Sequence, residues 1–203
     1  FPNIAQTPVW KMLLVMTVGF TLLPVPVSLD IRGWTEMHPL NGPAWSLFFE
    51  YIANILYAVL IRKFTSRWLA VLVFLAACAL IHQCYTQGNN IGGWTLDVEQ
   101  CRVGLTRLMF PFFGGLLLFR LCKPGRVRHG FWWCSLLLVG ALAMPHVGGA
   151  ENFRLNGLYD AFCIIVIFPA VVFLGASDIP GDISSRASRF LGNISYPLYI
   201  THY

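Results

Sequence analysis

Apolar runs separated by short polar loops recur along the whole chain. They predict α-helices over residues 9–29, 44–61, 68–85, 102–120, 131–145, 159–176 and 190–203. A membrane-spanning helix needs about 20 predominantly apolar residues, within a range of about 17–25, and the segments 44–61, 102–120 and 159–176 meet that length. Pro24 and Pro26 interrupt the first run, so we expect its helix to kink or re-enter there.

The composition places these helices in a lipid bilayer. Hydrophobic residues make up 57% of the chain and charged residues 11%, whereas a soluble domain carries roughly 25% charged residues. The mean hydropathy of +0.64 is too high for a water-soluble globule of 203 residues. We therefore predict an all-α fold, a polytopic transmembrane helix bundle of about six to seven helices. One domain covers residues 1–203, and the net charge of +5 does not indicate nucleic-acid binding.

The distribution of Lys and Arg predicts how the bundle is oriented. Alternate loops carry nine basic residues on one side and two on the other, and an excess of Lys and Arg marks cytoplasmic loops. The nine are Arg62, Lys63, Arg67, Arg120, Lys123, Arg126, Arg128, Arg186 and Arg189, and the two are Arg32 and Arg154. The loop 120–130 is suited to anionic lipid headgroups or a phosphorylated donor, although membrane topology explains its charge equally well.

Glu50 is an ionisable residue within the apolar run 44–61. Charges at such depth cost about 2.5–3.5 kcal/mol on insertion scales and usually face the bundle interior. Ser46, Glu50, Asn54 and Tyr57 follow one another at offsets of four, four and three, which places them on one stripe of a helix. The stripe predicts a site in the bundle interior or, alternatively, a structural contact between helices.

Two other polar side chains lie in the apolar runs. We expect Arg107 and Glu50 to lie roughly 7–9 Å below the outer ends of their helices, where equal depth permits an ion pair. The alternative is that Arg107 extends its guanidinium to the headgroups. His202 lies about 18 Å along a helix that rises from the cytoplasm, and it is a candidate for a functional histidine or a packing residue.

Other chemistries lack a signature in this sequence. There is no phosphate-binding Walker loop, no dinucleotide fingerprint and no HExxH. The six cysteines show no CxxC spacing, so we expect no metal site.

Two stretches resemble a known family of membrane enzymes. Residues 39–50 read Pro-Leu-Asn-Gly-Pro-Ala-Trp-Ser-Leu-Phe-Phe-Glu and resemble the Trp-Ser-Leu-x-x-Glu signature of the acyltransferase 3 family. Residues 190–202 are similar to the family's late helix, which opens Leu-Gly-x-Ile-Ser-Tyr-Pro-Leu-Tyr and ends in His. Weaker matches lie between them in the family's order: Arg107 with Phe113 and Gly114, and Asn-Gly-Leu-Tyr-Asp at 156–160 before an apolar run with Pro169.

The resemblance implies a bundle of about ten membrane-crossing helices that acyl-CoA enters from the cytoplasm. The family's acid/base His on its N-terminal helix, and its Arg-x-x-Arg pair, have no match here, and we expect them upstream of Phe1. The family's final helix is also unmatched. We therefore expect this chain to be a partial transmembrane acyltransferase domain that is inactive alone.

The resemblance also assigns roles to side chains. Glu50, Arg107 and His202 are the candidate catalytic residues: Glu50 orients a cation or binds the acceptor, Arg107 holds Glu50, and the helix of His202 walls the cavity. Six further residues are expected to contact substrate: Trp45, Ser46, Asn54, Tyr57, Tyr196 and Tyr199.

The sequence thus predicts a membrane-bound enzyme that moves an acyl group, such as acetyl, to a hydroxyl. The donor is acyl-CoA as co-substrate, with no further cofactor. The acceptor is a glycan, a lipid-linked sugar or another cell-surface or small molecule, and the location is the bacterial inner membrane. A multi-pass transporter or channel is the alternative, because it too carries intramembrane charge and broken helices. A non-catalytic membrane scaffold is a third.

Overall fold

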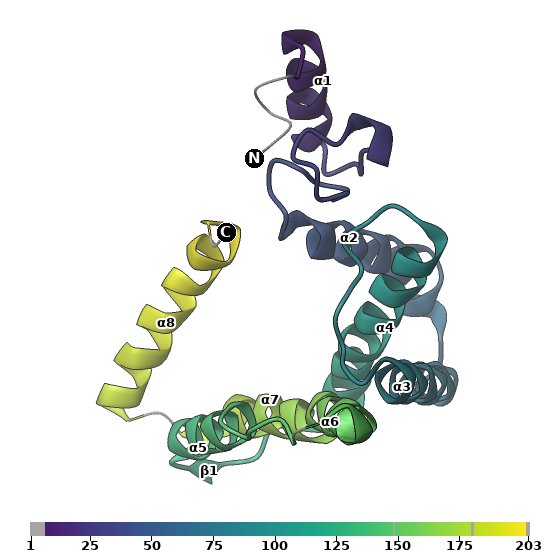
Figure 1. Ribbon diagram of the computed structural model, residues 1–203. Helices are drawn as coiled ribbons and strands as arrows, with labels where there is room; N and C mark the ends of the chain where they lie inside the picture. Colours follow the sequence, from purple (N-terminus) through teal and green to yellow (C-terminus); the bar gives the residue numbers. More distant parts are fainter. Residues whose placement is uncertain (1–6, 148, 180, 202–203) are drawn as a thin grey trace. The chain divides into compact units, whose positions relative to one another are not determined.

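The computed structural model describes residues 7–147, 149–179 and 181–201, and its regular structure is almost entirely helical (Figure 1). The helices are α1 (Val9–Gly19), α2 (Ala44–Val59), α3 (Ser66–Gln87), α4 (Val98–Leu121), α5 (Gly130–Leu142), α6 (Phe153–Phe162), α7 (Phe168–Ala176) and α8 (Asp182–Thr201). Two short strands, β1 (Val127–Arg128) and β2 (Asp178–Ile179), form a parallel pair. The all-α prediction is confirmed.

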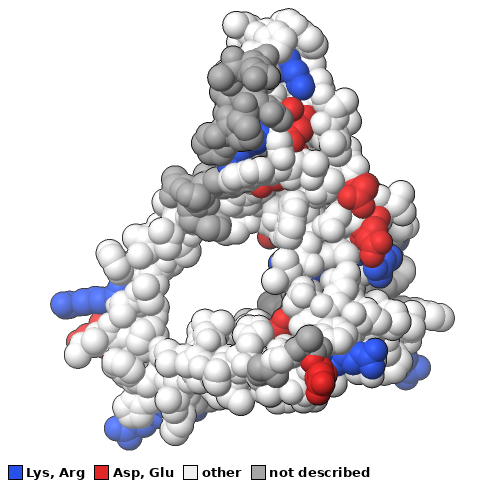
Figure 2. Space-filling model, in the orientation of Figure 1, with Lys and Arg blue, Asp and Glu red and all other residues white. Residues whose placement is uncertain are grey.

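Among the described residues, three helical segments are long and apolar enough to cross a membrane: Ser66–Gln87, Val98–Leu121 and Phe153–Ala176. The last is continuous because a π-helical turn, Cys163–Ile167, joins α6 to α7. Charged side chains are sparse on the visible face of the molecule (Figure 2), as expected for a surface that meets lipid. The expectation that 44–61 has spanning length was wrong, because α2 has 16 residues and a 3₁₀ turn, Ile61–Lys63, follows it.

The first predicted helix is much shorter than its apolar run. α1 ends at Gly19, and Leu22 adopts a left-handed backbone conformation with φ of 58°. Pro24 and Pro26 follow within four residues, and neither can donate a helical hydrogen bond. The helix therefore ends before the prolines and does not kink at them.

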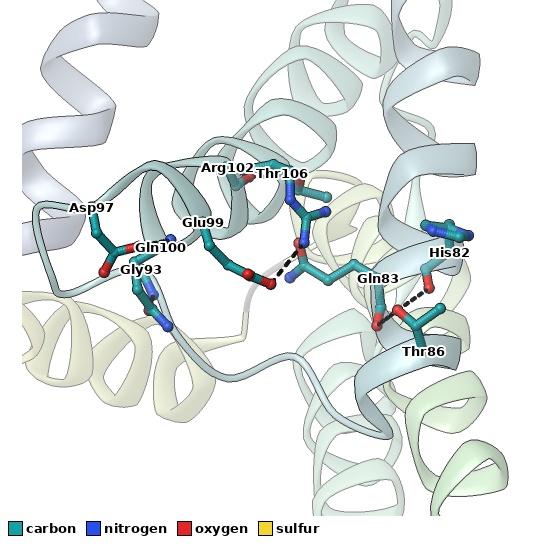
Figure 3. A network of polar contacts seen from close by, with 9 residues as sticks. All are labelled: His82, Gln83, Thr86, Gly93, Asp97, Glu99, Gln100, Arg102 and Thr106. Atoms are coloured by element: carbon teal, nitrogen blue, oxygen red, sulfur yellow. Dashed lines mark hydrogen bonds and ion pairs between the residues drawn. The ribbon is translucent and has the colours of Figure 1, made fainter.

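Three other helices begin earlier than their apolar runs do. α4 begins at Val98 rather than 102, and the Asp97 carboxylate accepts the amide N–H of Gln100 at 2.8 Å (Figure 3). α6 begins at Phe153 rather than 159, and α8 at Asp182 rather than 190. Their first turns are polar, so hydropathy alone does not reveal them.

The chain divides into two compact units, and the first comprises 1–59, 91–108 and 196–203. Much of its core lies in the loop between α1 and α2, where Val25, Ile31 and Met37 are buried. Backbone hydrogen bonds join the pieces, from Val25 N–H to the Met37 carbonyl at 2.9 Å and from Met37 N–H to the Trp94 carbonyl at 2.7 Å.

The second unit comprises 60–90 and 109–195 and contains the closest helix packing. α3 contacts α6 at Gly157, whose Cα lies against the backbone of Cys84 and Gly88. α5 lies beside α7, and the Cys134 thiol donates to the Val171 carbonyl at 3.2 Å.

The loops that carry most of the basic residues meet on one side of this unit. The Arg120 guanidinium donates to the Phe64 carbonyl at 2.7 Å, which joins the end of α4 to the loop before α3. Strands β1 and β2 pair the α4–α5 loop with the residues after α7, with Val127 opposite Asp178 and Arg128 opposite Ile179. We refer to residues 125–130 and 177–179 together as the β1–β2 junction.

We predict that Gly157→Ala destabilises the protein, because the added methyl group would overlap the Cys84 carbonyl. Overpacking of this kind costs about 1–3 kcal/mol, and the apparent melting temperature in detergent should fall by several degrees. Gly115→Ala is the matched control, because nothing lies within 4 Å of a Cβ at that position and alanine favours the helix. Equal melting temperatures for Gly157→Ala and wild type would contradict the packing.

We also predict that the α1–α2 loop loosens in acid. His38 is 5% exposed, donates from Nε2 to the Leu22 carbonyl at 3.1 Å, and its pKa is lowered by burial despite that hydrogen bond. The unfolded loop therefore binds a proton first, so stability present above about pH 6.5 is lost as the pH falls through the lowered pKa.

Amide hydrogen exchange over residues 22–38 tests this expectation. Exchange should be faster at pH 5 than at pH 7.5 after correction for intrinsic rates, and His38→Gln should abolish the difference. His146→Gln, which changes an exposed histidine, should leave it intact. Equal protection of the wild type at both values would refute the prediction.

Candidate functional site

Arg107, half-buried on α4, binds two groups of the first unit. Its guanidinium lies over the Trp45 ring, 4.7 Å from the centroid, and donates to the carbonyl oxygen of Gly92. A cation over the face of a tryptophan is stabilised by about 0.5–2 kcal/mol, and more as water is removed. The planar guanidinium is thus fixed in position with its charge retained.

Two glycines make this arrangement possible. Gly92 and Gly93 have φ of 124° and 105°, which other residues rarely adopt. A Cβ on Gly93 would lie 2.9 Å from the Trp45 ring and 3.0 Å from Gly104. The loop therefore passes close to both Trp45 and α4, and the Gly93 N–H donates to the Gln100 side chain at 2.6 Å. The sequence analysis missed these residues, although the Gly-Gly pair was a signal.

The two segments that carry the family resemblance contact one another. The Tyr199 hydroxyl, at the end of α8, hydrogen-bonds the Ser46 hydroxyl and donates to the Pro43 carbonyl at 3.0 Å. Ser46 and Trp45 are neighbours in the first turn of α2, so Tyr199 and Arg107 both contact that turn. The structure thus brings together four of the predicted site residues.

Glu50 is exposed, and no salt bridge joins it to Arg107 in the part of the chain that the structure describes. The predicted pair depended on equal depth. Because α4 begins at Val98, Arg107 lies about 13.5 Å from its helix start and Glu50 about 9 Å from its own. The buried face of α2 is formed by Ala44, Phe49 and Ala53 instead of the polar stripe.

The other predicted site residues make few side-chain hydrogen bonds in the described part of the chain. Asn54 is exposed and donates to the Glu50 carbonyl of its own helix at 2.9 Å. Tyr57 is half-buried and Tyr196 is exposed. His202 lies outside the described residues.

Side chains of residues 156–160 form hydrogen bonds with several other segments of the second unit. The Asn156 side chain bonds both the N–H and the carbonyl of Val147, at 2.9 and 3.2 Å. The Tyr159 hydroxyl donates to the Ala141 carbonyl at 2.8 Å, and the Asp160 carboxylate accepts the Asn90 N–H at 3.2 Å. Asp160 therefore lies within α6 and joins this helix to the loop after α3.

The arrangement around Arg107 provides a fixed positive charge beside an aromatic ring. Such a charge stabilises an oxyanion or holds an anionic group. The described residues include no group of three or more His, Cys, Asp or Glu able to hold a metal ion.

Comparison with known proteins identifies the family. A family model described as an acyltransferase domain matches residues 3–203. The chain belongs to the acyltransferase 3 family. No curated protein and no solved structure shows significant similarity to it. Membership implies acyltransferase activity in general and a membrane-associated enzyme, in agreement with the three helices of spanning length.

We predict that Arg107→Lys lowers the acyl-transfer rate of this acyltransferase about tenfold or more. Lysine keeps the charge but lacks the planar fork that bonds Gly92 and stacks on Trp45, and each 1.4 kcal/mol lost is a factor of ten. Arg102→Lys is the control, because Arg102 lies on the same helix, is exposed and pairs with Glu99 at 3.4 Å (Figure 3). Wild-type rates for both variants would exclude Arg107 from the site.

Proposed function

We propose that this protein transfers an acyl group, such as acetyl, from acyl-CoA to a hydroxyl group of a carbohydrate or another cell-surface or small-molecule acceptor. The observation that carries the proposal is the contact between the two segments that resemble the family. They meet at the first turn of α2, where Tyr199 contacts Ser46 and Arg107 covers Trp45. We further propose that the enzyme acts in the bacterial inner membrane, with the basic loops on the cytoplasmic side.

The reaction requires a proton acceptor, an oxyanion stabiliser and two binding surfaces. The acceptor hydroxyl attacks the thioester carbonyl, its proton is removed, and the tetrahedral intermediate expels the coenzyme A thiolate. Arg107 suits the oxyanion, because its guanidinium is already held and needs no reorganisation as negative charge develops.

Glu50 suits the acceptor side of the reaction. Its carboxylate is exposed and makes no salt bridge within the described residues, so it is available to hydrogen-bond a hydroxyl of the acceptor. Trp45, with its ring partly covered by Arg107, offers an apolar wall close to the reacting groups.

Turnover of labelled acetyl-CoA by the full-length protein in lipid vesicles tests the proposal. We expect transfer of label to a hydroxyl-bearing acceptor. Solute uptake without thioester cleavage would instead establish a transporter. The absence of both activities would favour a non-catalytic membrane scaffold.

We predict that Glu50→Gln lowers transfer at least about tenfold, because a neutral amide binds the acceptor hydroxyl more weakly than a carboxylate does. Glu99→Gln is the matched control, since Glu99 is an exposed carboxylate at the start of α4. The double variant Glu50→Arg, Arg107→Glu should not restore activity, because the two side chains form no pair. Near-normal activity of a well-folded Glu50→Gln protein would remove Glu50 from the site.

A further inference from the structure

The β1–β2 junction holds a strongly basic loop in one conformation. The Gly125 N–H donates to Ser177 Oγ at 3.0 Å, and the Val127 N–H to the Ser177 carbonyl at 2.8 Å. The Gly130 N–H donates to the Asp178 carboxylate at 2.7 Å. Ser177 is 1% exposed, so these bonds are shielded from water. Positive charge alone suffices for membrane orientation, and therefore topology does not account for the fixed backbone.

Two arginines stand at alternate positions around β1, with Arg126 just before the strand and Arg128 as its last residue. Arg126 and Arg128 flank Val127 and are exposed, whereas Val127 is half-buried. Side chains at alternate positions of an extended chain lie on the same face, about 6.6 Å apart along it. Each guanidinium can bind phosphate oxygens in a bidentate manner, so two neighbouring arginines suit a ligand that carries more than one phosphoryl group.

The charge of this face is not neutralised from within the described ranges. Lys123, Arg126 and Arg128 make no salt bridge there. The carboxylate of the partner strand, Asp178, is bonded to Gly130 at the start of α5. Asp182, at the start of α8, is the other carboxylate near the junction in sequence, and it is exposed. A pair of arginines held in place without a carboxylate partner is suited to an anionic ligand.

We propose that the β1–β2 junction is a phosphate-binding site, and that Arg126 and Arg128 hold the phosphorylated end of the acyl donor there. The assignment of the donor rests on the proposed function. Coenzyme A carries a diphosphate and a ribose phosphate, which fit two adjacent guanidinium groups better than the single phosphate of most lipid headgroups. The nearby basic residues Arg186 and Arg189 of α8 add to the attraction without being fixed by strand pairing.

Kinetics of the full-length enzyme in vesicles test the site. The double variant Arg126→Gln, Arg128→Gln should raise KM for acetyl-CoA about tenfold or more, with kcat within about twofold, because lost charge-assisted bonds weaken ground-state binding. The same variant should use S-acetylpantetheine, which has no phosphate, as well as the wild type does. The double variant Arg186→Gln, Arg189→Gln is the control, because it removes the same number of positive charges from the basic loops. It should raise KM for acetyl-CoA much less.

A second variant tests the fixed backbone. Ser177→Ala removes the hydroxyl that accepts the Gly125 N–H and leaves every basic residue in place. It should raise KM for acetyl-CoA in the same direction by a smaller factor and leave S-acetylpantetheine unaffected. An unchanged KM in both the arginine and the serine variants overturns the proposal.

Direct binding separates this proposal from the proposed function. Adenosine 3′,5′-bisphosphate should bind the wild type in calorimetry and bind the arginine double variant at least about tenfold more weakly. Such binding in a protein that transfers no acyl group would defeat the proposed function and retain the phosphate site. Unchanged bisphosphate binding, with activity lost only in vesicles that contain anionic lipid, would assign the junction to lipid headgroups and overturn the donor assignment.

Discussion

A polar group among apolar helices must find its hydrogen-bond partners inside the protein, because lipid tails offer none. This constraint explains most of the ordered contacts described above. The Arg107 guanidinium uses a backbone carbonyl and an aromatic ring. Asn156 uses both backbone groups of Val147, and Tyr199 uses Ser46 and Pro43. In each case a side chain on one helix hydrogen-bonds to the backbone of another segment. The bonds that satisfy a polar group therefore also hold separate segments of the chain together.

Hydropathy was sufficient to predict the fold class and most of the helices, since burial in lipid requires long apolar runs. It failed where the first turn of a helix is polar, as at Val98, Phe153 and Asp182. That error carried into the site, because the depth comparison of Glu50 and Arg107 depended on where α4 begins. Trp45 and Ser46 were predicted to contact substrate, which stays a prediction, whereas their contacts with Arg107 and Tyr199 were not predicted.

The remaining features depend on which backbones come close across large sequence separations. Gly93 lies against the Trp45 ring and Gly157 against the Cys84 carbonyl, so neither position has room for a side chain, and no local sequence pattern reveals these neighbours. The pairing of Val127 with Asp178 could not be predicted from the sequence either, because a strand of two residues gives too short a pattern. The positive charge of the basic loops is evident from the sequence, but the strand pairing that orders one of these loops is not, and that order distinguishes a binding surface from a topological signal.

The π-helical turn at Cys163–Ile167 has a geometric consequence for the β1–β2 junction. Pro169 cannot donate to the carbonyl four residues earlier, and a wider turn accommodates that gap. Each residue of an α-helix advances the chain by about 100°. Removing one residue from this turn would therefore rotate everything beyond it by roughly that angle and swing Ser177 away from Gly125. The π-helical turn thus sets the rotation of α7 about its own axis, and this rotation places β2 beside its partner strand β1.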